Sequence, residues 1–282
     1  MTSFIQNTDF FAGNNPETIA SEYGTPVYVY NEKILRDRMA KVAKVITKYP
    51  YTANYSVKAN TNIHILKLAL EEGLNCDAMS VGEITLLMKA GFPVERIFFV
   101  PNNVAPYELA FALKNGVMTS LDSLSQLELF GEVCNQMEIA PENRKCAVRI
   151  NPGVGAGHHE KVVTGGKKTK FGIAEYSIPQ IFEIAEKYQI TIAGINQHIG
   201  SLFMDPQPYL DAVTNLLRIA HQFKNLEFID FGGGYGIPYH KLDDEKDFPM
   251  EDFKSRLEPI LDEFVVSYGK APLFKSEPGR YC

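Results

Sequence analysis

Short apolar, β-prone runs alternate with longer segments of helical periodicity over most of this chain. The runs that predict strands are residues 52–57, 74–78, 96–100, 117–120, 145–150, 192–198, 227–231 and 273–276. The segments between them that predict helices are residues 63–72, 81–90, 106–114, 123–137, 178–188, 208–223 and 250–266. Eight strands separated by helices predict an α/β protein with a (β/α)8 TIM barrel. A doubly wound parallel sheet is the alternative, but no Gly-x-Gly-x-x-Gly follows the first strand.

The N-terminal part of the chain has a different pattern. Residues 1–24 are polar and predict no regular structure, and Gly24-Thr25-Pro26 then introduces a predicted strand at residues 27–30. Asn31 can cap a helix predicted over residues 32–48, where apolar residues recur at helical spacing. The regular alternation begins only after this helix.

The C-terminal ends of the predicted strands carry many polar or glycine residues. In a TIM barrel these ends form the active-site face. The residues found there are Lys58, Asp77, Asn102, Asn103, Asp122, Arg149, Asn151, His198, Gly232, Gly233, Gly234 and Glu277. Their gathering at one end of the barrel predicts a catalytic or binding site.

Lys58 follows the first of these strands, in the run Tyr55-Ser56-Val57-Lys58-Ala59-Asn60. A lysine is strongly hydrated and costly to bury, so at the end of a buried strand it is either a solvated charge or an amine held for chemistry, such as a Schiff base. Taken alone, the solvated charge is the commoner case. The residues at the ends of the neighbouring strands are needed to distinguish a solvated charge from a reactive amine.

Three consecutive glycines, Gly232-Gly233-Gly234, follow the seventh predicted strand. Backbone N–H groups with no Cβ beside them can cradle a phosphate, and TIM barrels often hold phosphate after strands seven and eight. A tight turn that needs positive φ angles would explain part of the run. The position after strand seven favours the phosphate site.

Strands six and eight are followed by a ring, a hydroxyl, a carboxylate and a guanidinium. The imidazole of His198 can stack on a flat cofactor and Ser201 can donate to a phosphate, although a core histidine is the alternative. Glu277 can meet a cationic ring nitrogen and Arg280 can bind a carboxylate or phosphate, although a surface ion pair is the alternative. Together with Lys58, this set of groups suits pyridoxal phosphate.

A long glycine-rich stretch, residues 151–172, follows the fifth strand. Flexible loops of this length inside a compact domain are usually functional or disordered, and we interpret this one as a substrate loop or lid. His158 and His159 within it are adjacent and would point apart on a strand, so we expect no metal there.

Composition narrows the partners and the compartment. The 282 residues are 45% hydrophobic, as in an ordinary globular chain, and 28 Lys+Arg against 34 Asp+Glu give a net charge of -6, which argues against a nucleic-acid or membrane partner. No apolar run reaches the roughly 18 residues that cross a bilayer, and the N-terminus does not resemble a signal peptide, so we expect a cytoplasmic protein. Cys76, Cys134 and Cys146 stand singly, which predicts core residues.

The motifs resemble those of the fold type III, alanine-racemase-like pyridoxal-phosphate decarboxylases of amino acids, and within that family the diaminopimelate decarboxylases. The resemblance covers nearly all of the sequence from residue 25 onward. It rests on residues 55–60, 151–172, 198–201, 231–238 and 277–280, which occur in the family's order.

This resemblance implies the cofactor pyridoxal 5′-phosphate. Lys58 and His198 would be catalytic, Glu277 would pair with the ring nitrogen, and Arg280 would also bind the substrate. The implied cofactor-binding residues are Lys58, His198, Ser201, Gly233, Gly234, Glu277, Gly279 and Arg280. The implied reaction is decarboxylation of an amino acid, with meso-2,6-diaminopimelate giving L-lysine and CO2. An ornithine- or arginine-type decarboxylase and a non-catalytic pyridoxal-phosphate-binding barrel are alternatives.

Members of the family continue past the Glu-Pro-Gly-Arg motif into a β domain, which supplies a catalytic cysteine motif, substrate contacts and much of a dimer interface. Cys282 does not match that cysteine. We therefore expect this chain to be a fragment, in which residues 31–282 form the cofactor-binding barrel and residues 1–30 join a β domain mostly absent from the chain. The resemblance also implies a homodimer.

Overall fold

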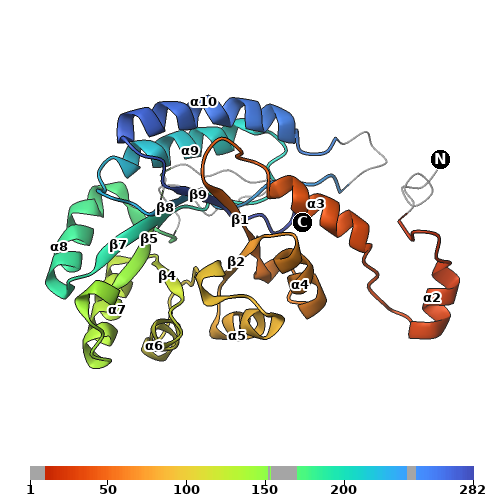
Figure 1. Ribbon diagram of the computed structural model, residues 1–282, viewed down its shortest axis with the longest axis horizontal. Helices are drawn as coiled ribbons and strands as arrows, with labels where there is room; N and C mark the ends of the chain where they lie inside the picture. Colours follow the sequence, from red (N-terminus) through yellow and green to blue (C-terminus); the bar gives the residue numbers. More distant parts are fainter. Residues whose placement is uncertain (1–9, 152, 154–169, 240–245) are drawn as a thin grey trace.

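The fold is a closed barrel of parallel strands surrounded by helices (Figure 1). The computed structural model describes residues 10–151, 153, 170–239 and 246–282. In these residues the barrel strands are β1 (Tyr51–Ser56), β2 (Asn75–Ala78), β3 (Ile97–Phe99), β4 (Met118–Leu121), β5 (Lys145–Asn151), β7 (Thr191–Asn196), β8 (Phe228–Asp230) and β9 (Leu273–Ser276).

The strand order confirms the TIM barrel and excludes the doubly wound sheet. Neighbouring strands pair in the order β4-β3-β2-β1-β9-β8-β7-β5, and a further β4–β5 pairing closes the circle. All of these pairings are parallel, so every strand's C-terminal end lies at the same mouth. A short strand, β6 (Ile173–Ala174), pairs in parallel with the end of β5.

The helices lie outside the strands, as Figure 1 shows, and several begin where a side chain caps the first turn. Asn62 and Ser123, for example, accept from backbone N–H groups of α4 and α7. The described helices around the barrel are α3 (Glu32–Val42), α4 (Ile63–Glu71), α5 (Val81–Ala90), α6 (Pro106–Lys114), α7 (Leu124–Gln136), α8 (Ile178–Tyr188), α9 (Gln207–Ala220) and α10 (Met250–Tyr268). None of the described helices combines the length and the apolar character that a membrane-spanning segment needs.

Apolar side chains fill two regions. The larger lies between strands and helices and includes Leu66, Leu217 and Phe274. The smaller lies inside the barrel, where the rings of Phe98 and Phe228 meet edge to face at 5.3 Å. Cys76, Cys134 and Cys146 are all fully buried, which confirms them as core residues.

Two predictions for the N-terminal part were wrong. Residues 27–30 form no strand, because no described strand lies beside them to receive their backbone hydrogen bonds. Residues 1–24 were predicted to be irregular, yet they contain a helix, α2 (Pro16–Tyr23), whose N-cap Asn15 accepts from the backbone N–H of Glu17. The helix lies to one side of the barrel and buries none of its side chains (Figure 1). The predicted helix at residues 32–48 is α3, which ends at Val42.

Candidate active site

A cavity of about 420 Å³ opens at the mouth of the barrel, where the chain segments after β1, β7, β8 and β9 meet. It brings together most of the predicted cofactor-binding residues from distant parts of the sequence. The lining residues are Ser56, Lys58, Ala59, His198, Ser201, Gly234, Ile237, Tyr239, Glu277, Gly279 and Arg280. Of the predicted set, only Gly233 does not line this cavity.

Lys58 reaches this cavity from a single 3₁₀ turn, η1 (Val57–Ala59), directly after β1. Its Nζ lies 3.9 Å from Oδ2 of Asp77 and 3.5 Å from Sδ of Met79, and its side chain is 45% exposed. The amine is therefore neither sealed in the core nor free on the surface. It lies at the wall of a cavity, beside a buried carboxyl group.

That carboxyl group belongs to Asp77 of β2, which is fully buried. Ser56 Oγ donates a hydrogen bond of 2.5 Å to its Oδ1, while Oδ2 accepts none from any described residue. Burial, and then the negative charge of Glu277, raise the pKa of Asp77 to about 8. The positive charge of Lys58 opposes the shift.

Glu277 follows β9 and is also buried, with 4% of its surface exposed. Its Oε1 has no hydrogen-bond partner in the described chain, and its Oε2 lies 3.9 Å from Nδ1 of His198. Burial, and then the charge of Asp230, raise the pKa of Glu277 to about 8. A cation that enters the cavity would lower this pKa and would supply the missing partner of the carboxylate.

His198 follows β7 and is held as a neutral ring. Burial, followed by the positive charges of Lys58 and Arg149, lowers the pKa of His198 well below its usual value. The backbone N–H of Gly233 points at Nδ1 across 3.4 Å, so Nδ1 is the acceptor nitrogen and Nε2 carries the proton. A neutral imidazole presents a flat face on which an aromatic ligand can stack.

The three glycines after β8 are required by close packing. A Cβ on Gly233 would lie 1.9 Å from the carbonyl oxygen of Glu277, and one on Gly232 would lie 2.3 Å from that of Gln197. Gly232 and Gly234 also have φ angles of +76° and +120°, which suit glycine. The tight-turn explanation therefore applies to this loop. It does not compete with ligand binding at Gly234, which lines the cavity.

Arg280 lies in the turn after β9. Its Nε donates to Ser201 Oγ at 3.2 Å and its Nη1 donates to the hydroxyl of Tyr239. No carboxylate in the described chain forms an ion pair with Arg280, so a surface ion pair with Glu277 does not explain it. A Cβ on Gly279 would lie 2.8 Å from Cβ of Ser56, so this glycine allows the turn to pack against the end of β1.

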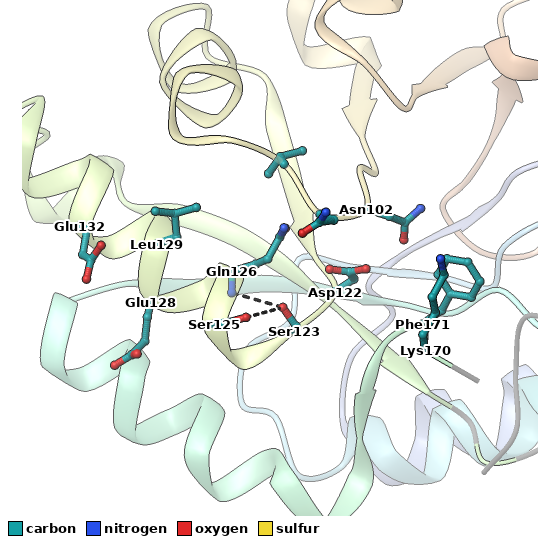
Figure 2. Close-up of a pocket in the computed structure, with 12 residues that line it drawn as sticks. Asn102, Asp122, Ser123, Ser125, Gln126, Glu128, Leu129, Glu132, Lys170 and Phe171 are labelled. Atoms are coloured by element: carbon teal, nitrogen blue, oxygen red, sulfur yellow. Dashed lines mark hydrogen bonds between the residues drawn. The ribbon is translucent and has the colours of Figure 1, made fainter. Parts of the chain in front are cut away.

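Other predicted strand-end residues line different cavities. A cavity of about 570 Å³ is lined by Asn102 and Asp122. Figure 2 shows Lys170 and Phe171 on the opposite side of Asp122 from Leu129 and Glu132. Arg149 lies near this region, since its Nη1 donates to Asn102 Oδ1 at 3.2 Å. This larger cavity lacks the combination of amine, imidazole and buried unpaired carboxylate, so we place the candidate site at Lys58.

Asn151 lines a third cavity, of about 760 Å³, together with Gly153. The predicted loop or lid falls largely on residue 152 and residues 154–169, which include His158 and His159 and lie outside the described residues.

Two residues in and near the site escaped the sequence reasoning. Tyr239 lines the cavity, and its only signal was an aromatic residue directly after Pro238 in the loop that follows β8. Lys275 lies inside the barrel with its Nζ 3.9 Å from the centre of the Phe228 ring. Lys275 lies two residues before Glu277, which directly follows the same strand, so the alternation of a strand could have placed Lys275 on the interior face.

The chain is similar to known proteins over most of its length. Residues 32–282 match the family model described as the pyridoxal-binding domain of pyridoxal-dependent decarboxylases. The diaminopimelate decarboxylase of Methanothermobacter thermautotrophicus is 39% identical over 277 residues, which cover 95% of this chain and 63% of that protein. The corresponding enzyme of Staphylococcus aureus is 32% identical over 276 residues, covering 95% of this chain and 64% of that protein.

A solved structure is similar as well. The diaminopimelate decarboxylase of Helicobacter pylori, complexed with L-lysine, superposes with a TM-score of 0.86 at 27% identity, over 95% of this chain and 66% of that one. The chain thus spans somewhat less than two thirds of the length of these relatives. Because the family model matches most of its residues, the chain belongs to the pyridoxal-dependent decarboxylases, of which it carries the pyridoxal-binding barrel.

Proposed function

We propose that this chain is the cofactor-binding part of an enzyme that converts meso-2,6-diaminopimelate into L-lysine and CO2, a reaction of lysine biosynthesis. One observation supports this most directly. An accessible lysine amine, a neutral imidazole, a buried carboxyl group with an unpaired oxygen and an arginine all line one cavity, and among the described residues no carboxylate pairs with that arginine.

The residues present fit pyridoxal 5′-phosphate. The amine of Lys58 would bond to the aldehyde carbon, the orphaned Oε1 of Glu277 would accept from the protonated ring nitrogen, and His198 would lie against the ring face. The predicted phosphate-binding residues are Ser201, Gly233, Gly234, Gly279 and Arg280. When bound, the cofactor supplies an electron sink for the electron pair left after CO2 departs.

The protein's own residues then have separate tasks. The amine of Lys58 would hold the cofactor, and as a free amine it would carry a proton, with Asp77 Oδ2 3.9 Å away as a partner. Glu277 would hold the proton on the ring nitrogen, because that cation would stabilise the ionised form of a carboxyl group that is only 4% exposed. His198, being neutral, does not compete for this proton.

The choice of diaminopimelate rests on the named relatives at 31–39% identity. The solved lysine/ornithine decarboxylase of Vibrio vulnificus and the arginine decarboxylase of a Chlorella virus are 21% and 23% identical, so they share the fold alone. An ornithine- or arginine-type activity is therefore the second candidate, and a barrel that binds the cofactor without turnover is the third.

The test is release of CO2 by the whole protein, this barrel together with the expected β domain, supplied with pyridoxal phosphate and measured with diaminopimelate, ornithine and arginine in parallel. We expect release from diaminopimelate alone. Faster release from ornithine or arginine would contradict the proposed substrate. Cofactor absorbance with no release from any of the three would favour the non-catalytic barrel.

We also propose that residues 1–30 pack against a β domain outside this sequence and that the whole protein is a homodimer. In support, Tyr23, Tyr28 and Tyr30 are 69%, 90% and 49% exposed, which is unusual for a run of aromatic residues. Light scattering of the protein in solution would test the dimer, and a monomer at micromolar concentration would contradict it. Cytoplasmic localisation remains a prediction.

A further inference from the structure

Arg280 is a cation held in place by neutral groups. Several other arginines near the surface form ion pairs with carboxylates. Arg36 pairs with Glu71 and Glu72, and Arg218 pairs with Glu175. Arg280 instead donates to two hydroxyl oxygens, those of Ser201 and Tyr239. Its positive charge is therefore oriented but not neutralised by the described residues.

The geometry leaves part of the guanidinium available. A guanidinium carries five N–H groups in a rigid plane, and Ser201 and Tyr239 each take one. The remaining N–H groups, on Nη1 and Nη2, form the kind of fork that binds two oxygens of a phosphate or carboxylate. Because Arg280 lines the same cavity as Lys58, that fork belongs to the candidate active site.

Tyr239 reaches Arg280 because two loops are joined together below it. The backbone N–H of Phe203 donates to Gly234 O at 2.9 Å, and that of Gly236 donates to Phe203 O at 2.8 Å. A Cβ on Gly236 would lie 2.5 Å from Phe203 O, so this approach requires glycine. Ser201, just before Phe203, and Tyr239, just after the glycine loop, are thereby brought to the same arginine.

We propose that Tyr239 is a positioning residue, which acts with Ser201 to hold the guanidinium of Arg280 so that its free N–H fork receives an anionic oxygen pair of the ligand. The anion is either the phosphate of the cofactor or a carboxylate of the amino acid. This identification of the anion rests on the proposed function, whereas the role of Tyr239 in anion binding does not.

The role of Tyr239 is tested with the full chain and four variants. Tyr239→Phe removes the hydroxyl and keeps the ring, Arg280→Met removes the fork, and the double variant combines them. Tyr107→Phe is the matched control, since Tyr107 is 70% exposed on α6 and lines none of the cavities described above. Folding of each variant is checked by urea denaturation.

The first probe is inorganic phosphate, with binding followed by phosphorus NMR in the absence of cofactor. The second is pyridoxal phosphate beside pyridoxal, which lacks the phosphate, followed by absorbance. The third is meso-diaminopimelate, followed by the absorbance change of the cofactor-loaded chain. We expect Tyr239→Phe to weaken at least one anionic probe about tenfold, because a hydrogen bond that orients a charged group is lost. Pyridoxal and the Tyr107→Phe control should show wild-type affinities.

The three probes distinguish the two candidate anions, and they test the role of Tyr239 separately from the proposed function. Weaker phosphate and pyridoxal phosphate binding would assign the fork to the cofactor, and weaker diaminopimelate binding alone would assign it to the substrate carboxylate. In either case, adding Tyr239→Phe to Arg280→Met should not weaken anion binding further, because Tyr239 acts through Arg280.

The proposal would be overturned if Tyr239→Phe bound all three anionic probes with wild-type affinity. It would also be overturned if the losses of affinity added in the double variant, or if the wild-type chain bound no anion. A wild-type chain that binds phosphate but no pyridoxal phosphate would instead refute the proposed function, while the phosphate arm would still decide the role of Tyr239.

Discussion

The carboxylate of Glu277 and the imidazole of His198 face each other across 3.9 Å, measured from Oε2 to Nδ1. Their usual ion pair is absent, because burial and two nearby cations keep the imidazole neutral. Glu277 is left as a buried acid whose Oε1 has no hydrogen-bond partner in the described chain. The site is therefore arranged to accept a cationic group, at the expense of the stability of the empty protein.

This arrangement predicts how the stability of the cofactor-free protein changes with pH. The pKa values of Asp77 and Glu277 are raised to about 8 and that of Asp230 to about 7, mainly by burial. Between their ordinary values and these raised values, the folded state holds protons that the unfolded state has released. Stability should therefore fall as the pH rises from about 5 to about 8, by at most about 1.4 kcal/mol per pH unit for each group.

Glu277→Gln should remove one of these three carboxyl groups and so make the free energy of unfolding less dependent on pH. The measurement is the free energy of unfolding in urea at pH 5, 6, 7 and 8, for the cofactor-free protein. Glu251→Gln is the control, because the side chain of Glu251 is 87% exposed. A Glu277→Gln profile as steep as that of the wild type would contradict the raised pKa of Glu277.

A second prediction concerns the hydrogen bond from Ser56 to Asp77. Ser56→Ala leaves Oδ1 of a fully buried carboxyl group without its donor, which should cost about 1–3 kcal/mol in the free energy of unfolding. It should also raise the pKa of Asp77 further, since this hydrogen bond lowers that pKa. Urea denaturation at pH 7 measures the cost. Ser255→Ala, at an exposed position of α10, serves as the comparison, and equal effects of the two substitutions would count against the prediction.

A third prediction concerns the glycine loop after β8. Gly233→Ala places a Cβ where the carbonyl oxygen of Glu277 lies 1.9 Å away, so the two backbone segments must separate. We expect a loss of about 3 kcal/mol or more, together with weaker cofactor binding, because Glu277 moves with its backbone. Gly82→Ala in α5 meets only Ser80 Oγ at 3.7 Å and should be neutral or stabilising by up to about 1 kcal/mol. Similar unfolding free energies for both variants would show that the loop has room that the structure does not indicate.

The barrel was predictable from the sequence because each strand is a short β-prone run and longer segments of helical periodicity separate the strands. Its eight strands occur where the pattern indicated, with ends that differ by at most two residues, and closure follows from their number. Residues 27–30 failed the same reasoning, since alternation cannot show whether a neighbouring strand exists. The helix α2 was missed although Asn15-Pro16 is a helix-start signal, because its few apolar residues give no buried face.

The candidate site was predictable to the extent that residues at strand ends share one mouth. That rule placed Lys58, His198 and Glu277 correctly relative to one another. The rule does not distinguish neighbouring cavities at the same mouth. Asn102 and Asp122 also lie at strand ends, yet they line a different cavity from Lys58. The sequence could not predict that Tyr239 lines the site, since its position depends on how the loops after β7 and β8 pack together.

The central claim is that Lys58 is the residue that bonds to the cofactor. The direct measurement is borohydride reduction of the chain loaded with pyridoxal phosphate, followed by peptide mapping, with Lys58→Ala as the control. We predict a stable label on Lys58, no label in the variant, and none on the buried Lys275. A label on another lysine, or none in protein whose absorbance shows bound cofactor, would contradict the account.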